Sequence, residues 1–127
     1  MTVRILIVDD NPTNLKLASD VLESEGFAVD SAEDAEEARL ALGQRLPDLI
    51  LMDIALPGMD GLTLTRLLKS EGRFAQVPIV ALTASAMRGD EEKALAAGCA
   101  GYITKPINTR TLGHRIRELL GSGASTT

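Results

Sequence analysis

Five short apolar runs, each separated from the next by a stretch with helical spacing, constrain the fold of this chain more than any other feature. The strongest runs lie at residues 5–8, 49–52 and 79–82, and weaker runs lie at 27–29 and 102–103. Short runs in which successive residues are apolar are typical of strands that are covered on both faces. The pattern therefore predicts the buried strands of a parallel sheet.

The stretches between these runs repeat apolar residues at the spacing of an amphipathic helix. The five expected helices are marked by Leu15, Ala18 and Leu22; Ala35, Ala38 and Leu42; Leu64, Leu67 and Leu68; Met87, Ala94 and Leu95; and Leu112, Ile116, Leu119 and Leu120. Gly26 is placed to end the first helix, and Ser31-x-x-Asp34 is typical of a capping box before the second. The alternation predicts an α/β fold of the flavodoxin-like (βα)5 kind. Its doubly wound five-stranded parallel sheet has the order 2-1-3-4-5, with helices on both faces.

Length and composition fit one compact domain. We place that domain at residues 1–121 of the 127 and expect a short flexible tail at 122–127, where small polar residues predominate. Hydrophobic residues make up 45% of the chain, which is enough for a core. The net charge is −5 and the 13 basic residues are scattered, whereas a nucleic-acid-binding protein usually gathers its basic residues on one face. We therefore expect no nucleic-acid partner.

The cellular setting is indicated by what the sequence lacks. Cys99 is the only cysteine, so an internal disulfide is impossible and a buried, inert thiol is expected. The N-terminal run is too short for a signal peptide, and no apolar segment approaches the roughly 20 residues of a membrane span. We expect a cytoplasmic protein without a membrane partner. No sequence feature decides between a monomer and a weak dimer.

Polar residues lie just after four of the apolar runs. These residues are Asp9 and Asp10 after the first run, Asp53 after the third, Thr83 at the end of the fourth, and Lys105 after the fifth. In doubly wound sheets, ligands bind outside the carboxyl ends of the strands where the winding reverses, which here is between the first and third strands. The three carboxylates, the hydroxyl and the ammonium are therefore expected at one binding site.

The chemistry of this set favours a metal ion and a phosphoryl group. Three carboxylates in one cleft require a cation, and Mg²⁺ prefers oxygen ligands that include one or two carboxylates and a phosphate. Mg²⁺ and Lys105 would balance the three negative charges and would also bind the oxygens of an incoming phosphoryl group. An aspartate can itself act as the nucleophile and form an acyl phosphate. The residues therefore predict magnesium-dependent phosphoryl transfer.

Four motifs, VDDN, LMDIALPGMDG, ALTA and KP, occur in this order between Val3 and about residue 120. Together they resemble the receiver domain of two-component response regulators. The resemblance implies that Asp53 is the phosphoacceptor and that Mg²⁺ is the cofactor. It also implies that Asp10 binds the metal directly, Asp9 binds it chiefly through water, and the carbonyl group of Ala55 is a further ligand.

The resemblance also implies a mechanism for the site and the classes of protein with which the chain interacts. Thr83 would donate a hydrogen bond to the phosphoryl group and Lys105 would pair with it, so both share the chemistry with Asp53. The bond between Lys105 and Pro106 would be cis. Thr83 and Tyr102 would act as a switch that alters the face made by the fourth helix, fifth strand and fifth helix. The phosphodonor would be a sensor histidine kinase or a histidine phosphotransfer protein, and the target a downstream kinase or adaptor protein.

One segment, residues 79–107, is similar to the stand-alone cell-cycle receivers of the DivK kind, which act by binding histidine kinases. This similarity implies a signalling module whose only activity is its own phosphorylation and dephosphorylation, and not an enzyme acting on other substrates.

Other readings of the same residues stay open at this point. A magnesium-dependent aspartyl phosphohydrolase would use the same chemistry, but it usually carries an Asp-x-Asp motif and a cap insertion, and neither is found. A pseudo-receiver would lack Asp53, Thr83 or Lys105, and all three are present. A flavin site on this architecture is disfavoured by the scarcity of aromatic residues. For single residues, Thr83 is also a candidate helix cap, and Tyr102 is equally compatible with a fixed ring at the edge of the core.

Overall fold

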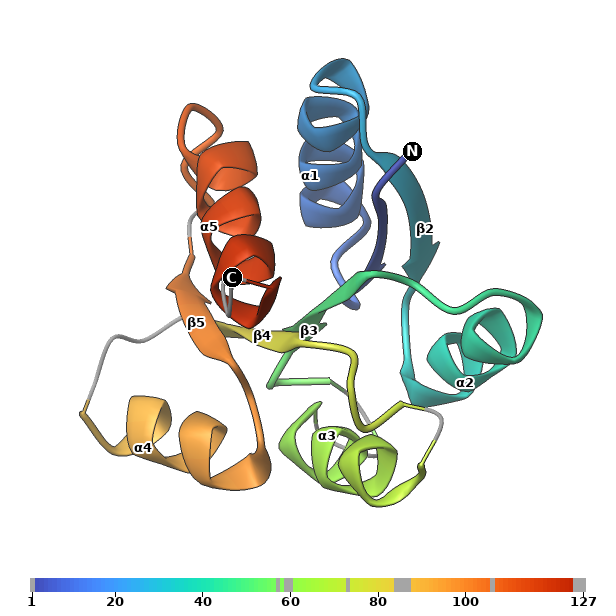
Figure 1. The fold of residues 1–127 in the computed structure, drawn as a ribbon, viewed down its shortest axis with the longest axis vertical. Coiled ribbons are helices and arrows are strands. Elements are labelled where there is room, and N and C mark those ends of the chain that lie inside the picture. Colours follow the sequence, from blue (N-terminus) through green and yellow to red (C-terminus); the bar gives the residue numbers. More distant parts are fainter. Residues whose placement is uncertain are drawn as a thin grey trace.

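The sheet has five parallel strands in the order β2-β1-β3-β4-β5, as predicted (Figure 1). The computed structural model describes residues 2–56, 58, 61–72, 74–83, 88–105 and 107–124. The strands are β1 (Arg4–Val8), β2 (Ala28–Ala32), β3 (Leu49–Asp53), β4 (Ile79–Thr83) and β5 (Gly101–Thr104). Because the chain passes from β1 outward to β2 and then returns to β3 on the other side of β1, the winding reverses between β1 and β3.

Five helices cover the two faces of this sheet. They are α1 (Pro12–Ser24), α2 (Ala35–Gln44), α3 (Gly61–Ser70), α4 (Arg88–Ala97) and α5 (Leu112–Ala124). In Figure 1 the strands run between α1 and α5 on one side and α2, α3 and α4 on the other. Each side has its own apolar core: Leu15, Leu22 and Ile116 belong to the first, and Leu42, Leu64 and Leu68 to the second.

Burial explains the continuous apolar runs of the central strands. All five residues of β3 and all five of β4 are buried, as are four of the five residues of β1. The edge strands β2 and β5 are only half-buried over most of their length, which explains their weaker apolar runs. Helices pack against both faces of a parallel sheet, so alternation of polar and apolar residues is lost in its central strands.

The helix boundaries agree with the sequence in one place and differ in another. Gly26 follows α1 with a φ of 95°, a left-handed conformation that suits glycine and ends a helix. The predicted cap of α2 was wrong by one turn. Asp34, and not Ser31, is the N-cap, and its side chain accepts a hydrogen bond from the N–H of Glu37 at 2.8 Å. Ser31 does not cap the helix because it is still paired within β2, which ends at Ala32, whereas α2 begins only at Ala35.

The C-terminal helix enters the segment expected as a tail at residues 122–127. Helix α5 continues to Ala124, and residues 125–127 lie outside the described part of the chain, so the domain boundary at residue 121 stays a prediction. Adding a residue to an existing helix costs less free energy than nucleating a new helix, so a helix can extend through residues of poor helix propensity. Among the described helices, none has both the length and the apolar character that crossing a membrane requires.

Candidate functional site

Asp9, Asp10 and Asp53 lie together at the carboxyl ends of β1 and β3. Asp53 is the last residue of β3, and Asp9 follows Val8, which pairs with Met52. This register places Asp9 beside Asp53 across the two neighbouring strands. Their position is the point where the winding of the sheet reverses, at which doubly wound folds bind ligands.

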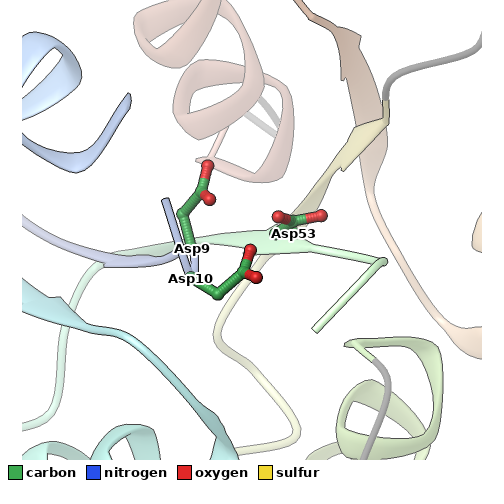
Figure 2. A group of neighbouring side chains, drawn as sticks. All are labelled: Asp9, Asp10 and Asp53. Atoms are coloured by element: carbon green, nitrogen blue, oxygen red, sulfur yellow. The ribbon is translucent and has the colours of Figure 1, made fainter. Parts of the chain in front are cut away.

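The three carboxylates surround a common space (Figure 2). One oxygen from each of Asp9, Asp10 and Asp53 can be chosen so that all lie within 4.8 Å of one another. Asp9 is 1% exposed and Asp53 is 4% exposed, whereas Asp10 is exposed to solvent. The carboxylates of Asp9 and Asp53 are thus removed from water, and that of Asp10 lies at the surface.

Each buried carboxylate is oriented by the main chain and by Lys105. Asp9 Oδ1 accepts a hydrogen bond from the N–H of Asn11 at 2.9 Å, and Asp53 Oδ1 accepts one from the N–H of Ala55 at 2.8 Å. The ammonium of Lys105 lies 3.0 Å from Asp9 Oδ2 and 3.0 Å from Asp53 Oδ2. Lys105 therefore bridges two carboxylates that would otherwise repel each other.

Among the described residues, the carboxylates of the cluster outnumber the basic groups that contact them. Burial raises the pKa of Asp9, and the nearby charge of Asp53 raises it further, although the Asn11 N–H and Lys105 act in the opposite direction. Burial by itself would lower the pKa of Lys105, but its contacts with Asp53 and Asp9 outweigh burial and raise it. Three carboxylates against one ammonium leave an excess of negative charge.

A divalent cation fits this donor set. Asp9 Oδ2 is buried, and within the described part of the chain no hydrogen-bond donor is aimed at it, although Lys105 lies close enough for an ion pair. A buried carboxylate oxygen without a hydrogen bond is costly. The cluster offers only oxygen donors, which is the ligand type that Mg²⁺ prefers, and two positive charges would complete its neutralisation.

Thr83 and Ala55 lie next to this cluster. Thr83 is the last residue of β4 and is 4% exposed, and its carbonyl oxygen accepts a hydrogen bond of 2.7 Å from the N–H of Lys105. Ala55 is exposed in the turn that follows β3. Pro106 lies outside the described residues, so the cis bond expected after Lys105 stays a prediction.

Tyr102 lies further from the edge than the other predicted residues. It pairs with Ala81, two positions before the end of β4, and it is half-buried against the core on the side of α2, α3 and α4. It also lines a cavity of about 260 Å³ between β5 and α5, together with Thr104 and His114. Tyr102 thus adjoins both the core and a hollow, and its role as a switch stays a prediction.

Sequence reasoning missed two residues that shape the site. Asn11 holds Asp9 through its N–H and also caps α1, because its side chain accepts from the N–H groups of Thr13 and Asn14. The pair Asn11–Pro12 carries a readable signal, since asparagine is a preferred N-cap and proline is favoured at the next position. Gly61 at the start of α3 packs directly on the backbone of Asp53, which no local pattern indicates.

Comparisons with known proteins agree with this architecture. Residues 5–117 match the model of the response regulator receiver domain. The chain is 40% identical over 121 residues to the polar-differentiation response regulator DivK of Brucella ovis, covering 95% of this chain and 98% of DivK.

Two solved structures show the same fold. The chemotaxis response regulator CheY4 of Vibrio cholerae superimposes with a TM-score of 0.89 at 25% identity, covering 94% of this chain and 99% of CheY4. The receiver domain of a sensor histidine kinase from Pseudomonas aeruginosa, which has a magnesium ion coordinated in its active-site cleft, gives a TM-score of 0.86 at 36% identity. That alignment covers 95% of this chain and 99% of the receiver domain.

Proposed function

Because this chain belongs to the receiver-domain family of response regulators, we propose that it accepts a phosphoryl group on Asp53 in a magnesium-dependent reaction. The observation that carries the proposal is the cluster of Asp9, Asp10 and Asp53 with Lys105 bridging two of its members. Lys105 and a main-chain N–H orient the carboxylates of both Asp9 and Asp53. We choose Asp53 as the nucleophile because it ends the central strand β3 and occupies the position of the phosphoacceptor in the family.

Asp10, Asp53 and the carbonyl group of Ala55 would hold Mg²⁺, and Asp9 would bind it chiefly through water. When bound, the metal supplies positive charge that neutralises the phosphoryl oxygens. The magnesium ion in the receiver domain from Pseudomonas aeruginosa supports this choice of metal. The ammonium of Lys105 would contact the incoming phosphoryl group as well as the two carboxylates. The Thr83 hydroxyl would donate a hydrogen bond to the same phosphoryl group.

Phosphoryl transfer needs little covalent chemistry from the protein. A carboxylate oxygen of Asp53 forms a bond to phosphorus while the bond from phosphorus to the donor histidine nitrogen breaks. The electron pair of that bond stays on the imidazole of the donor. No proton has to be removed from Asp53, so the absence of a nearby histidine or cysteine base is consistent with the reaction.

Phosphorylation would be read out at the face made by α4, β5 and α5. The modification adds negative charge and acceptor oxygens at Asp53, which attract the Thr83 hydroxyl. Movement of Thr83 would let the ring of Tyr102 turn, and the cavity of about 260 Å³ beside Tyr102 provides space at this face. A two-state element biased in this way can expose a different surface to a partner.

The partners follow from the same proposal. The donor would be a sensor histidine kinase or a histidine phosphotransfer protein, and the target a downstream kinase or adaptor protein. The similarity to DivK over nearly the whole of both chains makes single-domain signalling in the cytoplasm the first role to test.

The proposal is tested by phosphotransfer from phosphorylated histidine kinases of the source organism. We expect one kinase or phosphotransfer protein to transfer one equivalent of phosphoryl group rapidly and preferentially. The same preparation should show no repeated turnover of p-nitrophenyl phosphate. Transfer from none of the kinases, or sustained hydrolysis of that substrate, would favour an aspartyl phosphohydrolase or an interaction domain that is not phosphorylated.

Replacing Asp10 with alanine should weaken Mg²⁺ binding by at least about tenfold. Loss of a residue that only hydrogen-bonds a metal ligand typically weakens metal binding by that much, and loss of a direct ligand should weaken it at least equally. Isothermal titration calorimetry of the Asp10→Ala variant measures the change. Asp20→Ala is the matched control, because Asp20 is an exposed aspartate paired with Lys16 on α1. Equal Mg²⁺ affinity in the wild type and in Asp10→Ala would remove Asp10 from the metal site.

A further inference from the structure

We propose that Gly61 is a positioning residue for the phosphoacceptor turn, defined as residues 53–55, and that Thr65 secures it. The inference rests on the function proposed above and extends the site to two residues outside the carboxylate cluster. Gly61 begins α3, and Thr65 follows one helical turn later.

Gly61 is in contact with the backbone of the phosphoacceptor itself. A Cβ atom at position 61 would lie 2.8 Å from the carbonyl carbon of Asp53 and 2.8 Å from Cα of Ile54, with the carbonyl oxygen of Asp53 nearer still. Real Cβ atoms essentially never approach other heavy atoms this closely. All three neighbours belong to the backbone, so a larger residue could not be accommodated by turning a side chain.

The strand on the other side of this contact cannot easily yield. Asp53 pairs with Leu82 of β4, and the N–H of Ile54 donates a hydrogen bond of 3.1 Å to the carbonyl oxygen of Leu82. The N–H of Gly61 donates a bond of 3.4 Å to the carbonyl oxygen of Ile54. The phosphoacceptor turn is therefore held between β4 and the first residue of α3, so a displaced α3 would move the turn.

The turn carries two of the groups that the reaction needs. Asp53 supplies the nucleophile, and Ala55 supplies both the N–H that orients it, at 2.8 Å, and the carbonyl group proposed to bind Mg²⁺. A displacement of the turn would thus change the nucleophile and the metal site together. A misplacement of about 1 Å can slow a reaction on the order of a hundredfold.

Thr65 fixes the first residue of α3 from within the protein. Its side chain is fully buried, and its hydroxyl donates a hydrogen bond of 2.8 Å to the carbonyl oxygen of Gly61. Thr65 also lies close to the thiol of Cys99, which is 7% exposed between α4 and β5, because its side chain opposes the rise in the pKa of Cys99 that burial causes. Residue 65 of α3 thus adjoins a second part of the fold.

The test measures phosphorylation by acetyl phosphate at saturating Mg²⁺, and Mg²⁺ affinity, for a set of matched variants. Gly61→Ala should lower the phosphorylation rate at least about tenfold and weaken Mg²⁺ binding. Gly72→Ala is the control, because a Cβ atom at position 72 would meet open space, and it should behave as the wild type. Thr65→Val keeps the shape but loses the hydroxyl and should lower the rate severalfold, whereas Thr65→Ser should restore it.

The outcomes separate this inference from the function on which it rests. If the wild type is not phosphorylated, the proposed function is wrong. If the wild type is phosphorylated and a folded Gly61→Ala, checked by circular dichroism, reacts at the same rate, Gly61 does not position the turn. If Gly61→Ala does not fold, the inference is tested by comparing the phosphorylation rates of Thr65→Val and Thr65→Ser. Equal rates for the valine and serine variants would overturn the inference, and a rate lost with valine and recovered with serine would support it.

Discussion

An Asp53→Asn variant should gain no phosphoryl group from acetyl phosphate and Mg²⁺ under conditions that modify the wild type fully. The amide of asparagine has nearly the same shape as the carboxylate, so the fold should be retained. It lacks the negative charge that makes a carboxylate oxygen nucleophilic, and it removes one charged ligand from the proposed metal site. Intact-mass spectrometry of both proteins after the same incubation measures the difference directly.

Asp48→Asn is the matched control for this experiment. Asp48 immediately precedes β3, at the end opposite Asp53, and it is exposed. The control makes the same chemical change next to the same strand without touching the carboxylate cluster, and it should be phosphorylated as the wild type is. A full gain of mass in Asp53→Asn would place the acceptor at another residue.

Replacing Lys105 with methionine should lower the free energy of unfolding of the metal-free protein by about 3 kcal/mol, because it leaves buried carboxylates without their cation. The side chain of Lys105 is 18% exposed, and those of Asp9 and Asp53 are 1% and 5% exposed, so solvent screens these ion pairs only weakly. The contacts raise the pKa of Lys105. While the carboxylates are ionised, their contribution is therefore fully present below the unfolded-state pKa of Lys105, which includes neutral pH, and is lost as the pH rises through the folded-state value.

Chemical denaturation at neutral pH, with and without Mg²⁺, measures this change. Mg²⁺ should restore part of the lost stability, because it supplies positive charge to the same carboxylates. Lys16→Met is the control, since the ion pair of Lys16 with Asp20 on α1 is exposed, and it should change stability by no more than about 0.5 kcal/mol. If Lys105→Met were as stable as this control, the bridge between the two carboxylates would not be a significant stabilising contact.

The sheet and the meeting of the acidic residues could be predicted because both follow from local patterns. Continuous apolar runs are typical of strands that are covered on both faces, and the runs at residues 49–52 and 79–82 lie in strands that are buried at every position. In a parallel sheet the carboxyl ends of all strands meet at one edge, so Asp9 and Asp53 had to lie close together once the strand order was known. No long-range information beyond the order of the strands was needed.

The remaining features depend on contacts between segments far apart in the chain. Ser31 was a poor choice for the cap of α2 because the pairing of β2 with β1 extends the strand through Ala32. The contact of Gly61 with Asp53 depends on the path of the chain between β3 and α3, which composition does not determine. Whether Tyr102 faces the core or the hollow beside α5 likewise depends on packing between β5 and its neighbours.

In the proposed reaction, Mg²⁺ among the oxygens of the acidic cluster prepares residue 53 to attack phosphorus. Borohydride reduction identifies the acceptor, because it converts a phosphorylated aspartate into homoserine, which peptide mass mapping locates. The wild type should carry homoserine at position 53 alone after acetyl phosphate treatment, and the yield should fall sharply when EDTA removes the metal. Homoserine at another position, or the same yield at position 53 with and without metal, would contradict the proposed reaction.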